Sequence, residues 1–137
     1  MDTLDKIITW FGGLAKDYRD IERLLYAQKQ LAVELYNDAK RVGELYELAR
    51  GTEYARKTAF ERERLRLIAE GSTAAKAEAE ARTAVETLAF SETTADAEYR
   101  TALLRHQAAA DILRAMQQHI SSLKDERRFD MAGGSNE

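Results

Sequence analysis

Apolar residues recur in alternating steps of four and three along the N-terminal half of this chain of 137 residues. The spacing averages 3.5 residues, so these positions stay on the one face of a helix that winds around a partner. They are Leu14, Tyr18, Ile21, Leu25, Gln28, Ala32, Leu35, Ala39, Val42, Tyr46 and Ala49. Leu24, Leu31, Leu45 and Leu48 widen the stripe, which favours contact with more than one neighbouring helix.

A second stripe of the same period lies in the C-terminal half. It comprises Tyr99, Ala102, His106, Ala109, Leu113, Met116, Ile120 and Leu123. It continues backwards more weakly through Ala95, Leu88, Val85 and Ala81, with Glu92 interrupting it. The two stripes predict an all-α fold of long antiparallel helices, assembled as a coiled-coil or helical-bundle oligomer, because an isolated hairpin would not cover stripes this wide.

Nine residues of these stripes are our candidates for the core or the oligomer interface. They are Leu14, Ile21, Leu25, Leu35, Val42, Leu113, Met116, Ile120 and Leu123. Each is apolar and lies at a stripe position, so its burial would drive the helices together.

Glycines divide the chain into the helices that we expect. The sequence predicts one helical domain over residues 1–130, followed by a disordered tail at 131–137. The predicted elements are a short amphipathic segment at 3–11, a long helix at 14–50, a connecting helix at 53–70, and one long helix or two helices at 74–128. Gly12-Gly13, Gly51 and Gly71 mark the boundaries, and a break within 91–94 is left open.

The composition narrows the class of protein. Proline and cysteine are both absent, so neither a disulfide framework nor a thiolate zinc site is expected. The short N-terminal apolar stretch carries Asp2 and Asp5, which argues against a secretory signal or a membrane span. We therefore expect a cytoplasmic protein, in the host cytoplasm if a phage encodes it. We expect residues 3–11 to dock on a neighbouring subunit or a partner protein and not on a membrane.

No group of residues in the sequence suggests catalysis. The two histidines, His106 and His119, lack the helical spacing of metal ligands, and neither a nucleophile motif nor a phosphate-binding loop occurs. We expect His106 to be a buried histidine satisfied by a neighbour, and His119 to face solvent. The sequence therefore predicts no enzyme, no metal and no cofactor.

Residues 54–66 are the most informative polar stretch. They interleave Tyr54 and Phe60 with five cations, namely Arg56, Lys57, Arg62, Arg64 and Arg66. Cations that follow phosphates beside rings that stack on bases are typical of proteins that bind single-stranded nucleic acid. The alternative is a surface of ion pairs, because glutamates lie three and four residues from several of these cations.

The chain resembles small helical proteins that phages encode near their recombination genes, and it is similar to the phage recombination mediator (UvsY-like) family. The likeness covers about residues 45–130. It rests on the size of the chain, the basic stretch at Arg56–Arg66, the break at Gly71 and an amphipathic C-terminal helix. The resemblance implies a ring-like oligomer that binds single-stranded DNA through the basic stretch and helps to load a recombinase.

Two functions follow from these patterns. The first is an oligomeric helical accessory protein that binds single-stranded DNA and a recombinase. The second is a protein-interaction module without a nucleic-acid role, such as an inhibitor, a chaperone or a structural coiled coil from a phage or a bacterium. A net charge of −3 and an acidic stretch at Glu70–Glu98 distinguish the chain from a uniformly basic DNA-binding protein.

Overall fold

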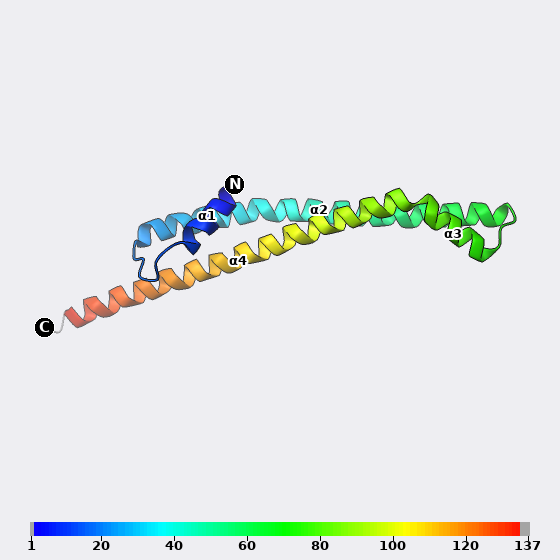
Figure 1. Ribbon diagram of the computed structural model, residues 1–137. Coiled ribbons are helices and arrows are strands. Elements are labelled where there is room, and N and C mark those ends of the chain that lie inside the picture. Colours follow the sequence, from blue (N-terminus) through cyan, green and yellow to red (C-terminus); the bar gives the residue numbers. More distant parts are fainter. Residues whose placement is uncertain (1, 135–137) are drawn as a thin grey trace. The chain divides into compact units, whose positions relative to one another are not determined.

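The computed structural model describes residues 2–134, which form four α-helices and no strand (Figure 1). The helices are α1 (Thr3–Gly12), α2 (Ile21–Ala69), α3 (Ala74–Ala84) and α4 (Glu86–Gly134). The all-helical class predicted from the stripes is confirmed. The chain divides into two compact units, which we call the terminal unit (Met1–Lys40 with Leu104–Glu137) and the middle unit (Arg41–Leu103).

In the terminal unit, α1 packs against both long helices. Leu4 and Ile7 of α1 are buried with Leu31 and Leu35 of α2 and with Met116 of α4. Trp10 of α1 packs against this cluster and against a second one, formed by Ile21, Leu24, Ile120 and Leu123. The pairs Arg19–Glu126 and Asp38–His106 show that α2 and α4 run antiparallel here, because the residue number rises on one helix as it falls on the other.

Most of the predicted core residues are covered within one chain. Ile21, Leu35, Met116, Ile120 and Leu123 are buried, while Leu14, Val42 and Leu113 are half-buried. These residues of the two stripes therefore pair with each other within one molecule.

Leu25 is the one of the nine candidates that lies outside the core of the single chain, because it is 40% exposed. The inward-facing positions of α2 coincide with the predicted stripe at Ile21, Gln28, Leu35, Val42 and Ala49. Between these residues, each observed inward position lies one residue before the predicted one. The inward residues there are Leu24, Leu31, Asp38 and Leu45, which replace the predicted Leu25, Ala32, Ala39 and Tyr46. Leucines stand at three of these four inward positions, so this register buries larger side chains than the predicted one.

In the middle unit, the C-terminal part of α2 packs with α3 and the start of α4 largely through alanine. Ala77, Ala81, Ala95 and Ala102 are buried there, together with Leu67 and Val85. The pairs Tyr46–Tyr99 and Arg56–Glu92 show that α2 and α4 are antiparallel in this unit as well. Small side chains let these helices approach closely.

The first helix boundaries differ from the prediction. Residues 14–20 form turns, and α2 begins at Ile21 because the Asp20 carboxylate caps it, accepting a hydrogen bond from the Arg23 amide at 3.1 Å. The helix then continues through Gly51, so the predicted helices at 14–50 and 53–70 are one. A single glycine costs a helix only about 1 kcal/mol, and the Thr52 hydroxyl bonds back to the Ala49 carbonyl at 2.8 Å and does not cap a new helix.

The predicted stop at Gly71 agrees with the structure. Its φ of +99° suits glycine, and the amides of Gly71 and Ser72 donate to the carbonyls of Ile68 and Leu67. Thr73 then caps α3 by accepting from the Lys76 amide.

The C-terminal segment forms two helices, and the break falls at Val85 and not within 91–94. Residues 91–94 remain helical, with the hydroxyls of Ser91, Thr93 and Thr94 donating to carbonyls four residues earlier. The predicted disordered tail is wrong for residues 131–134, because α4 extends through Gly134. Residues 135–137 of that prediction lie outside the described residues.

Candidate functional site

The five cations proposed to contact nucleic acid all lie on α2, and four of them form ion pairs. Lys57 Nζ lies 2.7 Å from Glu53, and Arg64 Nη2 lies 2.8 Å from Glu61. Arg66 bonds to Glu63 and to Glu70. Arg56 reaches across to Glu92 of α4. Arg62 alone of the five has no ion pair with any residue in the range 2–134.

The pKa values agree with these pairings. The Glu92 carboxylate hydrogen-bonds to Arg56 and raises the pKa of that guanidinium, and Glu63 does the same for Arg66. In return, the hydrogen bond from Lys57 lowers the pKa of Glu53, as that from Arg64 does for Glu61. The glutamates therefore offset much of the positive field of this segment.

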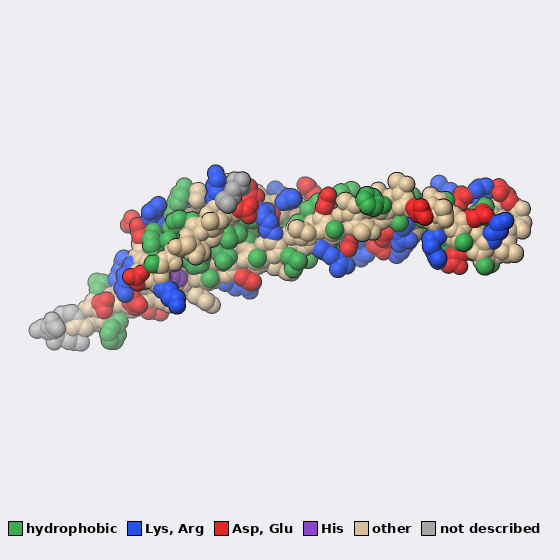
Figure 2. Space-filling model, in the orientation of Figure 1, with side chains coloured by type: hydrophobic (Ala, Val, Ile, Leu, Met, Phe, Trp, Pro, Cys, Tyr) green, Lys and Arg blue, Asp and Glu red, His purple; other side chains and the backbone are tan. Residues whose placement is uncertain are grey.

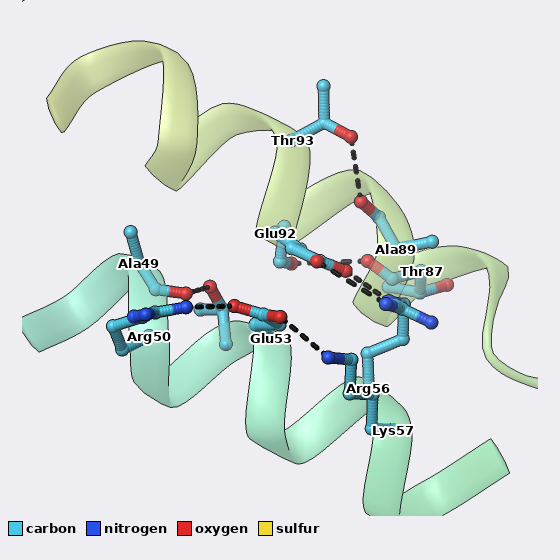
Figure 3. Close-up of polar contacts among 11 residues, drawn as sticks. Ala49, Arg50, Glu53, Arg56, Lys57, Thr87, Ala89, Glu92 and Thr93 are labelled. Carbon is cyan, nitrogen blue, oxygen red and sulfur yellow. Dashed lines mark hydrogen bonds and ion pairs between the residues drawn. The ribbon is translucent and has the colours of Figure 1, made fainter. Parts of the chain in front are cut away.

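Glu92 explains why a polar residue interrupts the second stripe. Its carboxylate accepts hydrogen bonds from Nε and Nη2 of Arg56, the second at 3.4 Å, and both side chains are about three-quarters buried (Figure 3). Arg56 stands on the inward face of α2 at the matching level. Two hydrogen bonds from one guanidinium to one carboxylate hold α2 and α4 at a fixed distance in the middle unit.

A polar cavity of about 370 Å³ lies beside this pair in the middle unit. Tyr46 and Tyr99 line it with their rings 5.3 Å apart, and Arg50 donates to the Tyr46 hydroxyl at 3.0 Å and to Glu53 at 3.1 Å. Most of the charged side chains that line the cavity pair with one another, and Asp96 pairs with Arg100 at 2.8 Å. The geometry therefore offers a hydrogen-bonding recess.

A second polar group, which sequence reasoning missed, lies in the terminal unit. Asp38 of α2 is almost buried; its carboxylate lies 2.9 Å from His106 Nδ1 and 3.5 Å from Arg105 Nη1. Arg105 also contacts Asp5 at 3.1 Å and Asp2 at 2.5 Å, so it ties α1 to α4. Asp38 and His106 both occupy inward positions of their stripes, and a polar residue at such a position is the signal that could have revealed the pair.

Burial disfavours the charge on Arg105, but the hydrogen bonds that its guanidinium donates to Asp2 and Asp5 outweigh this effect and raise the Arg105 pKa. The pKa of Asp2 is lowered, first by the hydrogen bond that it accepts from the Asp5 amide and then by Arg105. Asp2 is thus both the N-cap of α1 and an anchor for it.

The histidines fit this arrangement to different degrees. His106 is half-buried and satisfied by Asp38, as its place on the stripe led us to expect. His119 is also half-buried, and its Nε2 lies 2.8 Å from the Tyr18 carbonyl, so its predicted solvent-facing position is wrong.

The surface of the terminal unit carries apolar side chains that nothing covers. A groove of about 310 Å³ between α1 and α2 is lined by Ile7, Trp10, Tyr26 and Ala27, with Lys6 and Arg23 among its polar lining residues. Tyr26 of this groove, together with Val33 and Tyr36 farther along α2, is exposed; the exposed fractions are 66%, 56% and 67%. On the face that Figure 2 shows, hydrophobic side chains gather over the terminal unit, and charged side chains are interspersed with hydrophobic ones over the middle unit.

Other kinds of site find no support in the described part of the chain. Residues 2–134 contain no cluster of three or more histidine, aspartate or glutamate residues placed to hold a metal ion. No helix among them is long and apolar enough to span a membrane. The helix α1 buries its apolar face against α2 and α4 of the same chain, and not against a second subunit or a partner protein as expected.

Comparison of the sequence and structure with known proteins identifies no relative. No protein-family model matches the chain, and neither a curated protein nor a solved structure is significantly similar to it.

Proposed function

We propose that this protein is a non-enzymatic helical interaction module that works by self-association. The observation that carries the proposal is the uncovered apolar face of α2 in the terminal unit, where Tyr26, Val33 and Tyr36 are all more than half exposed. Aromatic residues on a rigid helix provide large contact areas at low cost in conformational entropy. The face lies on the unit with the larger apolar core, so it is held in shape before a partner arrives.

The test is the oligomeric state of the full chain, measured by sedimentation velocity between about 1 and 100 μM, the range in which modest interfaces assemble. We expect a concentration-dependent oligomer that Val33→Lys dissociates. Leu48→Lys is the matched control, because Leu48 is as exposed as Val33 and lies on the same helix but in the middle unit. A monomer throughout this range would refute the proposal, as would equal effects of the two variants.

Single-stranded DNA binding is the second candidate, as the resemblance and the basic stretch imply. It is favoured by the exposed ring of Tyr54 and by Arg62, which forms no ion pair within the described chain. The paired state of the other four cations counts against a strong interaction, because a phosphate would have to displace a glutamate from each one.

Binding of a fluorescent oligothymidine at increasing salt tests this second candidate. Contacts to two or more phosphates give a clear negative slope of log affinity against log salt concentration. We expect the triple change of Arg62, Arg64 and Arg66 to alanine to abolish that slope, while Arg114→Ala, on α4, leaves it unchanged. Absence of binding at low salt would remove the nucleic-acid role and leave self-association as the function.

A further inference from the structure

The outer face of α2 carries a heptad stripe of its own. Its residues follow steps of four and three, as Glu22, Tyr26, Lys29, Val33, Tyr36 and Lys40. All six are exposed. At about 100° of rotation per residue, the stripe is centred roughly 160° around the helix from the buried residues Leu24, Leu31 and Leu35, so α4 does not reach it.

The order of residues in this stripe is self-complementary when a second copy is placed antiparallel to the first. Residues at equal distances on either side of Leu31 then face each other across the two helices. Glu22 faces Lys40, Tyr26 faces Tyr36, and Lys29 faces Val33. This places a carboxylate opposite an ammonium group and one tyrosine ring opposite another. The aliphatic part of the lysine side chain packs on the valine.

We propose that two copies of the chain pair through this stripe as a twofold antiparallel coiled coil, with Glu22 opposite Lys40 of the partner subunit. The proposal rests on the self-association proposed above and names its surface and register. A twofold axis level with Leu31 makes the interface isologous, so each contact occurs twice. The paired segments span about 27 Å at 1.5 Å per residue.

The charges of the stripe are available for this pairing. Glu22, Lys29 and Lys40 form no ion pair with any of residues 2–134. The Lys40 ammonium lies 5.2 Å from the centre of the Tyr36 ring and so stays close to the apolar part of the face. In the antiparallel dimer it would lie beside both the carboxylate of Glu22 and a pair of tyrosine rings.

A parallel pairing of the same stripe is disfavoured by its charges. In register, it would set each of Glu22, Lys29 and Lys40 against its own copy, giving three repulsive contacts in place of two attractive ones. Like charges brought together across an interface suppress the wrong pairing. An unrelated partner would have no reason to match the order of these charges, so a second copy of this chain is the occupant that the stripe favours.

Charge reversal tests the register. Glu22→Lys should weaken self-association by about tenfold or more, because attraction becomes repulsion at two symmetric places. Combining it with Lys40→Glu restores opposite charges and should recover most of the affinity. Glu98→Lys makes the same change in charge at an exposed position on α4, away from the stripe, and should have little effect. Far-UV circular dichroism of each variant confirms that its helices remain.

Disulfide formation tests the orientation, because the protein has no cysteine of its own. Lys29→Cys and Val33→Cys are made as separate proteins of different tag length and then mixed under mild oxidation. The antiparallel pairing predicts the mixed disulfide, whereas a parallel pairing predicts the two homodisulfides, since Cα atoms more than about 7 Å apart are not bridged.

The outcomes separate this inference from the proposed function. Self-association that persists unchanged in Glu22→Lys, or that yields homodisulfides, overturns the antiparallel register while the interaction module stands. A monomer at all concentrations overturns both. Loss of association in Glu22→Lys without recovery in the double variant overturns the Glu22–Lys40 pairing.

Discussion

Leu24 and Leu25 are adjacent leucines that the structure places in opposite environments. The side chain of Leu24 is 0% exposed and that of Leu25 is 40% exposed. Leu24 packs with Ile21, Ile120 and Leu123 in the second apolar cluster of the terminal unit. The same substitution, leucine to alanine, at each of the two positions therefore tests the heptad register of α2.

The two substitutions should differ severalfold in cost. At Leu24, alanine loses the transfer free energy of the buried carbons and leaves a cavity, so unfolding should become easier by about 2–5 kcal/mol. At Leu25, part of the side chain is already in water and the space left opens to solvent, so we expect about 1 kcal/mol or less. The change in helix propensity is the same at both sites and cancels in the comparison.

Urea unfolding followed by tryptophan fluorescence measures this difference. Trp10 is the only tryptophan and contacts both apolar clusters, so its signal reports on the terminal unit. The midpoint should fall clearly for Leu24→Ala with little change in the slope m. If Leu25→Ala lowered the free energy of unfolding as much as Leu24→Ala or more, the observed register would be refuted and Leu25 would belong to the core.

Four further outcomes are expected. Arg105→Ala should release α1 and destabilise the terminal unit by about 1–3 kcal/mol, because the nearly buried Asp38 loses one of its two partners. Limited proteolysis should then cleave α1 faster than in the wild type, and an unchanged cleavage rate would contradict the prediction. The pKa of Asp2 in the folded protein lies below its usual value of 3.8. The stabilisation that Asp2 provides should therefore be complete well above pH 3.8 and be lost as the pH falls through the folded-state pKa. An acid titration followed by tryptophan fluorescence detects this loss. Glu92→Ala should destabilise the middle unit by about 1 kcal/mol, whereas Glu92→Leu combined with Arg56→Met should recover stability in thermal unfolding. Amide hydrogens of residues 41–103 should exchange sooner than those buried in the terminal unit, and the reverse order would show that alanine packing is the stronger.

The helical class and the C-terminal stripe were predictable because their apolar positions are unambiguous. Each residue from Tyr99 to Leu123 in the predicted stripe is buried or half-buried. On α2, adjacent pairs such as Leu24 and Leu25 left two registers open, and the sequence pattern alone offers no basis for the choice. The observed register also turns Asp38 inward, which is tolerable only because Arg105 and His106 meet it. A partner more than sixty residues away along the chain is invisible to a local pattern.

Helix boundaries failed for a similar reason. A glycine ends a helix where the chain needs a positive φ, as at Gly71, and is tolerated where neighbouring turns hold the helix together, as at Gly51. The ion pairs of Lys57, Arg64 and Arg66 follow the three- and four-residue spacings visible in the sequence. The pair of Arg56 with Glu92 could not be predicted in this way, because Glu92 lies on another helix.

The two units are held by different physical means, and this difference bears on function. The terminal unit buries leucine, isoleucine and methionine from three helices, whereas the middle unit buries mainly alanine and fixes its spacing by the Arg56–Glu92 pair. The free energy gained by burial rises with the apolar area buried, so the terminal unit should be the more stable of the two. The exposed stripe of α2 lies on this unit. Association there would not have to order the helix first, and its binding free energy would go into the contact itself.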